Sequence, residues 1–184
     1  MTTTGTLTTL HNFAGGADDG YPNHGLTLGA DGNFYGVTDG AGTSTQNGIG
    51  FRITPTGTLT VLANFEINQP LNEGPKSNLV LASDGNFYGV DLNHLFKMTP
   101  TGTVTNVYPF CQQANCLDGA GPDAVVLGAD GNVYGTANFG GSGTCMFSAF
   151  LPAGCGVVFK WTVSQSGPPP PPGPTITLVA NAEG

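Results

Sequence analysis

Short runs of apolar residues alternate with turn signals along most of the chain. The runs hold three to six residues rich in Val, Leu, Phe, Tyr and Thr, and Gly and Pro separate them. Several runs place apolar and polar residues at alternate positions, as a half-buried strand does, and none shows the longer period of a helix. Branched and aromatic residues favour strands. The pattern therefore predicts an all-β protein made of short antiparallel strands.

One hexapeptide organises these runs into a repeat. Asp31-Gly-Asn-Phe-Tyr-Gly36 returns as Asp84-Gly-Asn-Phe-Tyr-Gly89 and as Asp130-Gly-Asn-Val-Tyr-Gly135. Each copy follows one apolar run and precedes two others, and an Asp-Gly pair between two such runs is typical of a β-hairpin. Four strands at this period are typical of a β-propeller blade, a sheet that packs face to face on its neighbours.

We therefore expect a single repeat domain over residues 1–184 with three four-stranded antiparallel meander units. The units cover about residues 14–66, 67–110 and 111–183. Thr-Pro-Thr-Gly sequences at 54–57 and 99–102 predict the turns between the third and fourth strands, because Pro presets the first angle of such a turn. A pseudo-threefold prism or trefoil is the alternative architecture.

The repeat resembles the Gloeo/Verruco tandem-repeat family of bacterial proteins. The resemblance rests on the Asp-Gly-Asn-x-Tyr-Gly hexapeptide, the Phe-x-x-Thr segments that follow it and the later Gly and Leu, and it covers residues 5–163. It implies a propeller-like architecture on a secreted or surface-attached protein, and it carries no catalytic residues. Longer members of the family have enough units to close a ring, whereas this chain offers three.

Two further segments read like fourth strands. Residues 5–13 repeat the sequence of residues 57–65 almost unchanged, and residues 175–183 form a second copy behind a proline-rich spacer at 164–174. The chain thus encodes one fourth strand more than three units accept. A spacer of this composition is extended, and it is either a tolerated loop insertion or an arm that reaches a neighbouring subunit. The strand residues expected to be buried are Leu7, Leu10, Leu59, Val61, Ile176 and Leu178.

The surplus strand suggests a function. A strand added to an open sheet edge supplies backbone hydrogen bonds and apolar burial together. We therefore expect a non-enzymatic extracellular structural protein whose copies form a filament by head-to-tail β-strand donation, with Leu7, Leu10, Ile176 and Leu178 as the inter-subunit strand candidates. The alternative is a surface lectin-like module that binds glycans through loop aromatics, namely Tyr21, Phe139, Phe147 and Phe150.

Charge and cysteine content narrow the partners and the compartment. The formal net charge of -8 and the pI of about 4.3 disfavour binding to nucleic acid, and no apolar stretch is long enough for membrane insertion. The four cysteines form two close pairs, Cys111 with Cys116 and Cys145 with Cys155. Disulfides suit this spacing better than a tetrathiolate metal site, and they predict an extracellular or cell-surface location.

The residues give little support to catalysis or to a cofactor. We find no nucleophile elbow and no zinc-protease motif, the Asp-Gly-Asn turns lack the ligand spacing of a calcium loop, and the histidines occupy unrelated positions at 11, 24 and 94. We therefore expect no metal and no cofactor. The cations Arg52, Lys97 and Lys160 share one repeat position. We expect them to pair with the repeat acids at 31, 84 and 130 rather than to bind an anionic ligand.

Overall fold

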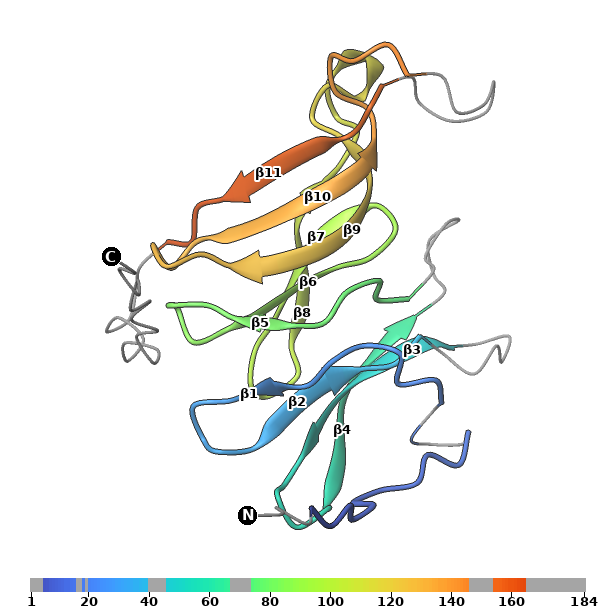
Figure 1. The fold of residues 1–184 in the computed structure, drawn as a ribbon, viewed down its shortest axis with the longest axis vertical. Helices are drawn as coiled ribbons and strands as arrows, with labels where there is room; N and C mark the ends of the chain where they lie inside the picture. The colour runs from blue at the N-terminus through green and yellow to red at the C-terminus, as the bar shows by residue number, and fades with distance from the viewer. Residues whose placement is uncertain are drawn as a thin grey trace, which may run out of the picture.

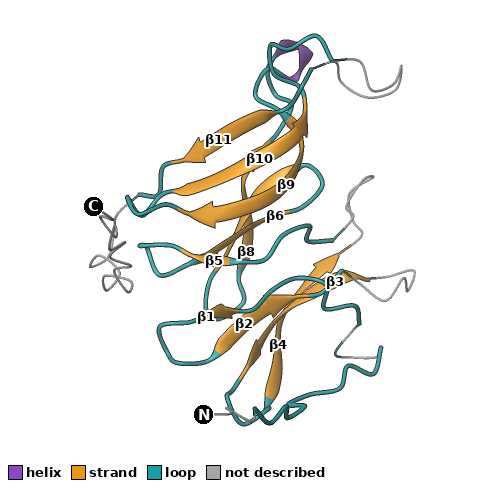
Figure 2. Ribbon diagram, viewed as in Figure 1, coloured by secondary structure: helices purple, strands orange, loops and turns teal. Residues whose placement is uncertain are grey.

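The computed structural model describes residues 5–15, 18, 20–39, 46–66, 74–145 and 154–164. These residues form three antiparallel sheets and one short 3-10 turn, so the all-β prediction is confirmed (Figures 1 and 2). The first sheet contains β1 (Thr27–Leu28), β2 (Phe34–Val37), β3 (Gln46–Ile53) and β4 (Leu59–Glu66). The second contains β5 (Val80–Leu81), β6 (Phe87–Val90), β7 (His94–Met98) and β8 (Val104–Pro109). The third contains β9 (Ala120–Leu127), β10 (Val133–Phe139) and β11 (Val157–Trp161).

Each sheet is a meander in which consecutive strands are neighbours, and the three sheets form a stack. The first strands of the sheets meet, since β1 contacts β5 and β5 contacts β9. One apolar cluster lies between the first and second sheets, and a larger one lies between the second and third. This arrangement of sheets packed face to face is that of consecutive propeller blades.

Aromatic side chains join neighbouring sheets in a repeated way. Tyr35 of the first sheet stacks on Phe87 of the second, with ring centroids 4.2 Å apart. Phe65 of β4 meets Phe96 of β7 edge to face at 5.1 Å. The equivalent pair between the second and third sheets joins Phe110 to Phe159 at 4.9 Å. Edge-to-face pairs are favoured by the charge distribution of the rings.

The glycine that ends each hexapeptide makes room for one of these rings. A Cβ atom at Gly36 would lie 2.5 Å from Cζ of Phe51 on the adjacent strand, and one at Gly89 would lie 2.7 Å from Cζ of Phe96. The ring of Phe159 covers Gly135 in the same manner. The close approach of a phenylalanine ring therefore explains why this position of the repeat is glycine.

The expected burial of Leu7 and Leu10 is wrong for the described chain. Residues 5–13 pair with no described strand, and Leu7 and Leu10 are 96% and 45% exposed. The physical reason is that no described sheet lies on the outer side of this segment. Leu59 and Val61 lie in β4 and are partly buried, as expected. The predicted strand at 175–183, with Ile176 and Leu178, and the spacer beyond residue 164 lie outside the described residues.

Both expected disulfides are present at one end of the third sheet. Cys111 pairs with Cys116 across the 3-10 turn η1 (Ala114–Cys116), and Cys145 pairs with Cys155 in the loop between β10 and β11. Backbone hydrogen bonds hold the two loops together, since the Gly141 amide donates to the Cys116 carbonyl at 2.9 Å.

The layer between the first two sheets predicts one stability effect. Phe96 is fully buried there, so Phe96→Ala is expected to lower the free energy of unfolding by about 3–5 kcal/mol through lost burial and a cavity. Val158→Ala, at a position that is largely exposed, should change it by less than about 0.5 kcal/mol. Chemical denaturation measures both, and equal effects would contradict the stacked arrangement.

The disulfides predict the behaviour of the thiols. The native protein should show no mass increase on treatment with an alkylating reagent, and it should accept four alkyl groups after reduction and unfolding, because all four cysteines are paired. Intact mass spectrometry measures both states. Alkylation of the unreduced protein would show that the disulfides are absent.

Candidate assembly interface

The repeated hexapeptide builds the same hydrogen-bonded turn in each sheet. The aspartate accepts a hydrogen bond from the asparagine two residues later and one from the tyrosine hydroxyl four residues later. The tyrosine bonds measure 3.0 Å for Tyr35 to Asp31, 2.9 Å for Tyr88 to Asp84 and 2.8 Å for Tyr134 to Asp130. A buried tyrosine thus keeps a partner for its polar end, and the turn fixes the position of its ring.

The surroundings of the three tyrosines differ. Burial, together with the hydrogen bond to Asp84, raises the pKa of the Tyr88 hydroxyl, and burial also raises the pKa of Tyr35. Tyr134 is partly exposed, and the ammonium group of Lys160 lies 5.4 Å from the centre of its ring.

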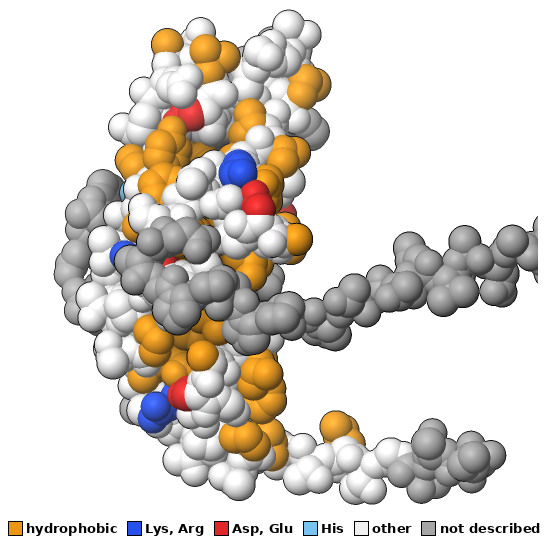
Figure 3. All heavy atoms as spheres, turned by 90° about the vertical axis from the view of Figure 1, so that its left-hand side faces the viewer, with side chains coloured by type: hydrophobic (Ala, Val, Ile, Leu, Met, Phe, Trp, Pro, Cys, Tyr) orange, Lys and Arg blue, Asp and Glu red, His pale blue; other side chains and the backbone are white. Residues whose placement is uncertain are grey.

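Lys160 also forms the expected ion pair with Asp130, at 2.9 Å. Figure 3 views the side of the stack that carries these turns, and cationic and acidic side chains lie next to each other there.

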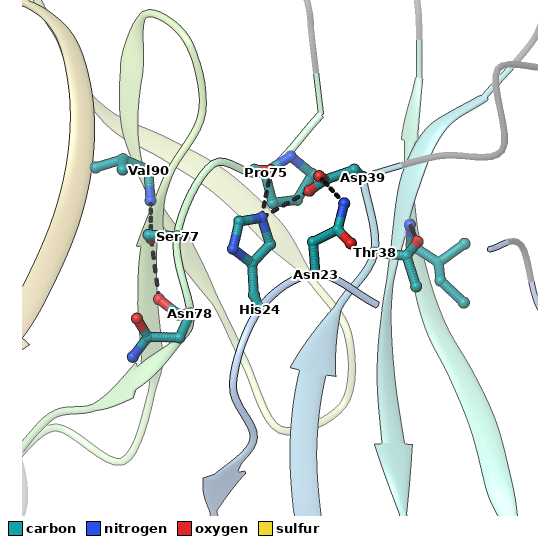
Figure 4. Close-up of polar contacts among 9 residues, drawn as sticks. Asn23, His24, Thr38, Asp39, Pro75, Ser77, Asn78 and Val90 are labelled. Carbon is teal, nitrogen blue, oxygen red and sulfur yellow. Dashed lines mark hydrogen bonds and ion pairs between the residues drawn. The ribbon is translucent and has the colours of Figure 1, made fainter. Parts of the chain in front are cut away.

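Polar contacts between the first and second sheets were not foreseen from the sequence. His24 Nε2 lies 2.6 Å from Oδ1 of Asp39 and 3.1 Å from the carbonyl oxygen of Pro75, which leads into the second sheet (Figure 4). Asn23 donates to the other oxygen of Asp39 at 2.7 Å. The Thr27 hydroxyl also donates across the layer, to the carbonyl of Leu79. The contacts to Pro75 and Leu79 join the two sheets, and Asn23 and Asp39 hold the His24 ring in place within the first unit.

The histidines have local acidic partners. His11 lies 2.9 Å from Asp18, and His94 lies 3.1 Å from Asp91. Within the described ranges, no three His, Cys, Asp or Glu side chains come together as metal ligands would. Among the loop aromatics of the glycan hypothesis, Tyr21 is exposed and Phe139 is partly buried, whereas Phe147 and Phe150 lie outside the described residues.

The third sheet presents an apolar outer surface, which we call the trailing face and define by Val126, Tyr134 and Val158. Val126 is 60% exposed and Val158 is 78% exposed. Their equivalents in the second sheet, Val80 and Leu95, are 8% and 1% exposed, because the third sheet covers them. The trailing face therefore repeats a surface that is buried elsewhere in the same chain.

The first sheet presents the complementary surface at the other end of the stack. This leading face is defined by Leu26, Leu28 and Phe34. Leu26 is 54% exposed, whereas its equivalent Leu79 is fully buried against the first sheet. The equivalent of Phe34 is Phe87, on which Tyr35 stacks. The two end faces thus have the residue types that meet inside the stack.

A cavity of about 460 Å³ opens beside β11. Its walls come from the second sheet, the loop that follows it and β11. We call this cavity the slot. The side chains that line it include Tyr108, Phe110, Leu117, Phe159 and Trp161.

The comparisons place the chain in a family. The Gloeobacter/Verrucomicrobia repeat matches residues 1–146, so the chain belongs to this repeat family, as the hexapeptides indicated. No curated protein matches the chain. Among the described residues, no helical segment is long and apolar enough to cross a membrane.

Some solved structures are similar to the chain over part of their length. They include a streptogramin B lyase (20% identity, TM-score 0.43, covering 61% of this chain and 33% of that one). A catalytically inactive virginiamycin B lyase from Staphylococcus aureus with quinupristin gives 16% identity and a TM-score of 0.44, covering 77% of this chain and 41% of that one. Regucalcin, a calcium-binding protein from Agrobacterium tumefaciens, gives 21% identity and a TM-score of 0.43, covering 61% and 37%. The chain therefore spans about a third to two fifths of the length of these proteins.

The ion pair of Lys160 with Asp130 predicts how the Asp130 carboxyl titrates. Hydrogen bonds from Lys160, then from Asn132 and Tyr134, hold the pKa of the Asp130 carboxyl below its ordinary value of 3.8. Lys160→Met should therefore raise that pKa toward 3.8, as measured by NMR titration of the carboxyl carbon, while Lys97→Met in the second sheet leaves it unchanged. Because the folded pKa is lowered, the interaction stabilises the fold above pH 3.8 and is lost as the pH falls through the lowered value. An Asp130 pKa that Lys160→Met leaves unchanged would contradict this account.

Proposed function

We propose that the protein is a non-enzymatic structural protein of the cell exterior whose copies form a filament by head-to-tail β-strand donation. In this proposal the trailing face of one copy packs on the leading face of the next. The strand exchanged between them completes a sheet across the junction.

The contrast in burial between equivalent residues carries the proposal. Val158 and Leu26 are mostly exposed at the two ends of the stack, while their equivalents Leu95 and Leu79 are buried between sheets. Covering a valine or leucine side chain contributes about 1.5–3 kcal/mol, so an uncovered end face is costly. A partner with the same repeat supplies the matching surface, because the chain already joins its own sheets in this way.

The two end faces differ from each other, and this decides the form of the assembly. A contact between unlike surfaces is heterologous, so each added copy presents the same two faces again. Such an assembly grows as an open filament unless the rotation at each junction closes a ring.

The disulfides support an exterior location. Paired cysteines persist in oxidising compartments and are rare where thiols are kept reduced. The Cys111–Cys116 turn leads into Leu117 of the slot lining, and Cys155 of the second pair lies two residues before Val157, which also lines the slot.

Electron microscopy of the purified full-length protein tests the filament. We expect fibres from the unmodified protein and dispersed particles from Val158→Asp, because a carboxylate on the trailing face cannot be buried without a partner. Thr101→Asp, in the exposed turn between β7 and β8, is the matched control and should still form fibres.

Circular dichroism should show that the monomers of both variants are folded, since both positions are exposed. Dispersed monomers or closed rings from the unmodified protein at high concentration would overturn the filament. Fibres from Val158→Asp would overturn the role of the trailing face.

A further inference from the structure

Residues 5–13, which we call the leading segment, adopt the local structure of an outer strand. Their sequence corresponds position by position to residues 57–65, which lead into β4, and to residues 102–110, which contain β8. The His11 and Phe13 rings meet edge to face at 5.0 Å and 88°, and the equivalent Tyr108 and Phe110 meet at 5.3 Å and 86°. The segment therefore has the form of a fourth strand although no described strand pairs with it.

The leading segment also contacts the first sheet as an outer strand contacts the next sheet. Phe13 packs edge to face on Phe51 at 5.4 Å and 69°, matching the pair of Phe65 with Phe96 at 5.1 Å and 65°. The carbonyl of Leu10 lies against Gly57 at the β3–β4 turn.

The equivalent carbonyl of Leu62 lies against Gly102 at the β7–β8 turn. Both glycines have positive φ angles, of 93° and 97°. The leading segment thus occupies the place of the fourth strand of a sheet that would precede the first.

Leu7 shows which side of this strand lacks a partner. Its equivalents Leu59 and Val104 pack on the side of their strand that faces away from the following sheet, and Val104 packs into the layer with the preceding one. Leu7 itself is 96% exposed. The side chain is thus available to a sheet that the leading segment would complete.

The third sheet has the complementary gap. Among the described residues it contains three strands, and β11 is paired only with β10, so the outer edge of β11 is open. The slot lies along this edge. In the second sheet, β8 fills the corresponding place. It pairs with β7, and its Val104 packs in the same cluster as Leu62 of β4 in the first sheet.

We propose that the leading segment of a second copy is the fourth strand of the third sheet, paired antiparallel with β11 and with Leu7 in the slot. The inference rests on the proposed head-to-tail assembly and names its donor and acceptor. The occupant is a second copy because the leading segment is held against the first sheet of its own chain, at the opposite end of the stack from β11.

The existing pairs set the register of the new one. The β3–β4 pairing places Phe51 opposite Val61, Arg52 opposite Thr60 and Ile53 opposite Leu59. The β7–β8 pairing repeats it with Phe96, Lys97 and Met98, and both pairings shift register at the same repeat position.

Transferred to β11, the register places Phe159 opposite Thr9, Lys160 opposite Thr8 and Trp161 opposite Leu7 of the second copy. A threonine then faces the cation in every sheet.

The sequence favours the leading segment over residues 175–183 as the donor. The three segments that pack on a following sheet end in a phenylalanine, at positions 13, 65 and 110. The corresponding position of the later segment is alanine, at 182. A donor that also joins two stacked sheets needs the ring, because the ring makes the edge-to-face contact of the layer.

Cysteine cross-linking tests the register. Chains with Thr8→Cys and chains with Lys160→Cys are mixed as full-length protein, assembled and oxidised mildly. Directly opposed residues of antiparallel strands have Cβ atoms close enough for a disulfide, and the native cysteines are already paired. We expect a cross-linked dimer of the two kinds of chain on a non-reducing gel, and at least tenfold less product when Asn138→Cys, exposed on β10, replaces Lys160→Cys.

The single tryptophan tests occupation of the slot, since Trp161 lines it. A synthetic peptide of residues 5–13, added to full-length protein, should shift the Trp161 emission to shorter wavelength and reduce fibre length. The same peptide with Leu7→Asp should do neither. In the full chain, Leu7→Asp should leave the monomer folded, because the residue is exposed, and abolish fibres.

The outcomes separate this inference from the proposed function. Fibres that persist in the Leu7→Asp chain, without a cross-link between positions 8 and 160, would overturn the leading segment as donor while the filament stands. Closed rings or short oligomers that carry the cross-link would support the strand exchange and overturn the filament. If the peptide leaves the emission unchanged and no cross-link forms, the strand exchange is wrong.

Discussion

The structure depends on packing between sheets, because no single sheet of this chain can bury both of its faces. Every sheet has apolar residues on both sides of its strands. In each layer between two sheets, tyrosine and valine side chains of one sheet pack on phenylalanine or valine side chains of the next. In such an array stability is a sum of sheets and of the contacts between neighbours. The second sheet, which has a neighbour on each side, contains several of the fully buried side chains of the described chain, including Phe87, Leu95 and Met98.

The turns make this packing repeat from sheet to sheet. An aspartate accepts hydrogen bonds from the backbone and side chain of the same turn and from the tyrosine two positions beyond the asparagine, so the carboxylate holds the ring that enters the next layer. The same residues therefore specify both the hairpin and the contact between sheets. This coupling explains why the hexapeptide recurs as a whole, and why its last residue is a glycine under a phenylalanine ring.

The sequence was informative wherever the information is local. The Asp-Gly and Thr-Pro-Thr-Gly turns, the strand order within each sheet and the close cysteine pairs all depend on neighbouring segments of the chain, and the structure contains them. The shared repeat position of the three cations predicted their pairing with the repeat acids. Lys160 pairs with Asp130 as expected, whereas among the described residues Arg52 and Lys97 form no ion pair with Asp31 and Asp84.

Features that depend on the spacing between sheets could not be predicted. The contact of His24 with Asp39 and Pro75 joins segments that no motif relates, and the slot exists only because β8 and β11 stand at a particular separation. The exposure of Leu7 was mispredicted for the same reason. Its sequence is that of a buried strand residue, but burial depends on a neighbouring sheet that the described chain does not place there.

For the proposed strand exchange, the leading segment is a favourable donor because contacts within its own chain already hold it. Fixing one residue of a free chain costs about 1–2 kcal/mol, so nine disordered residues would lose much of the gain from binding. Here Phe13 on Phe51, the Leu10 carbonyl on Gly57 and the pair of His11 with Asp18 hold the segment in a strand-like form before a partner arrives. Most of the ordering cost is thus met within the monomer. In the proposed assembly, a second copy would add backbone hydrogen bonds along β11 and the burial of Leu7 at little further entropic cost, because these contacts already hold the donor.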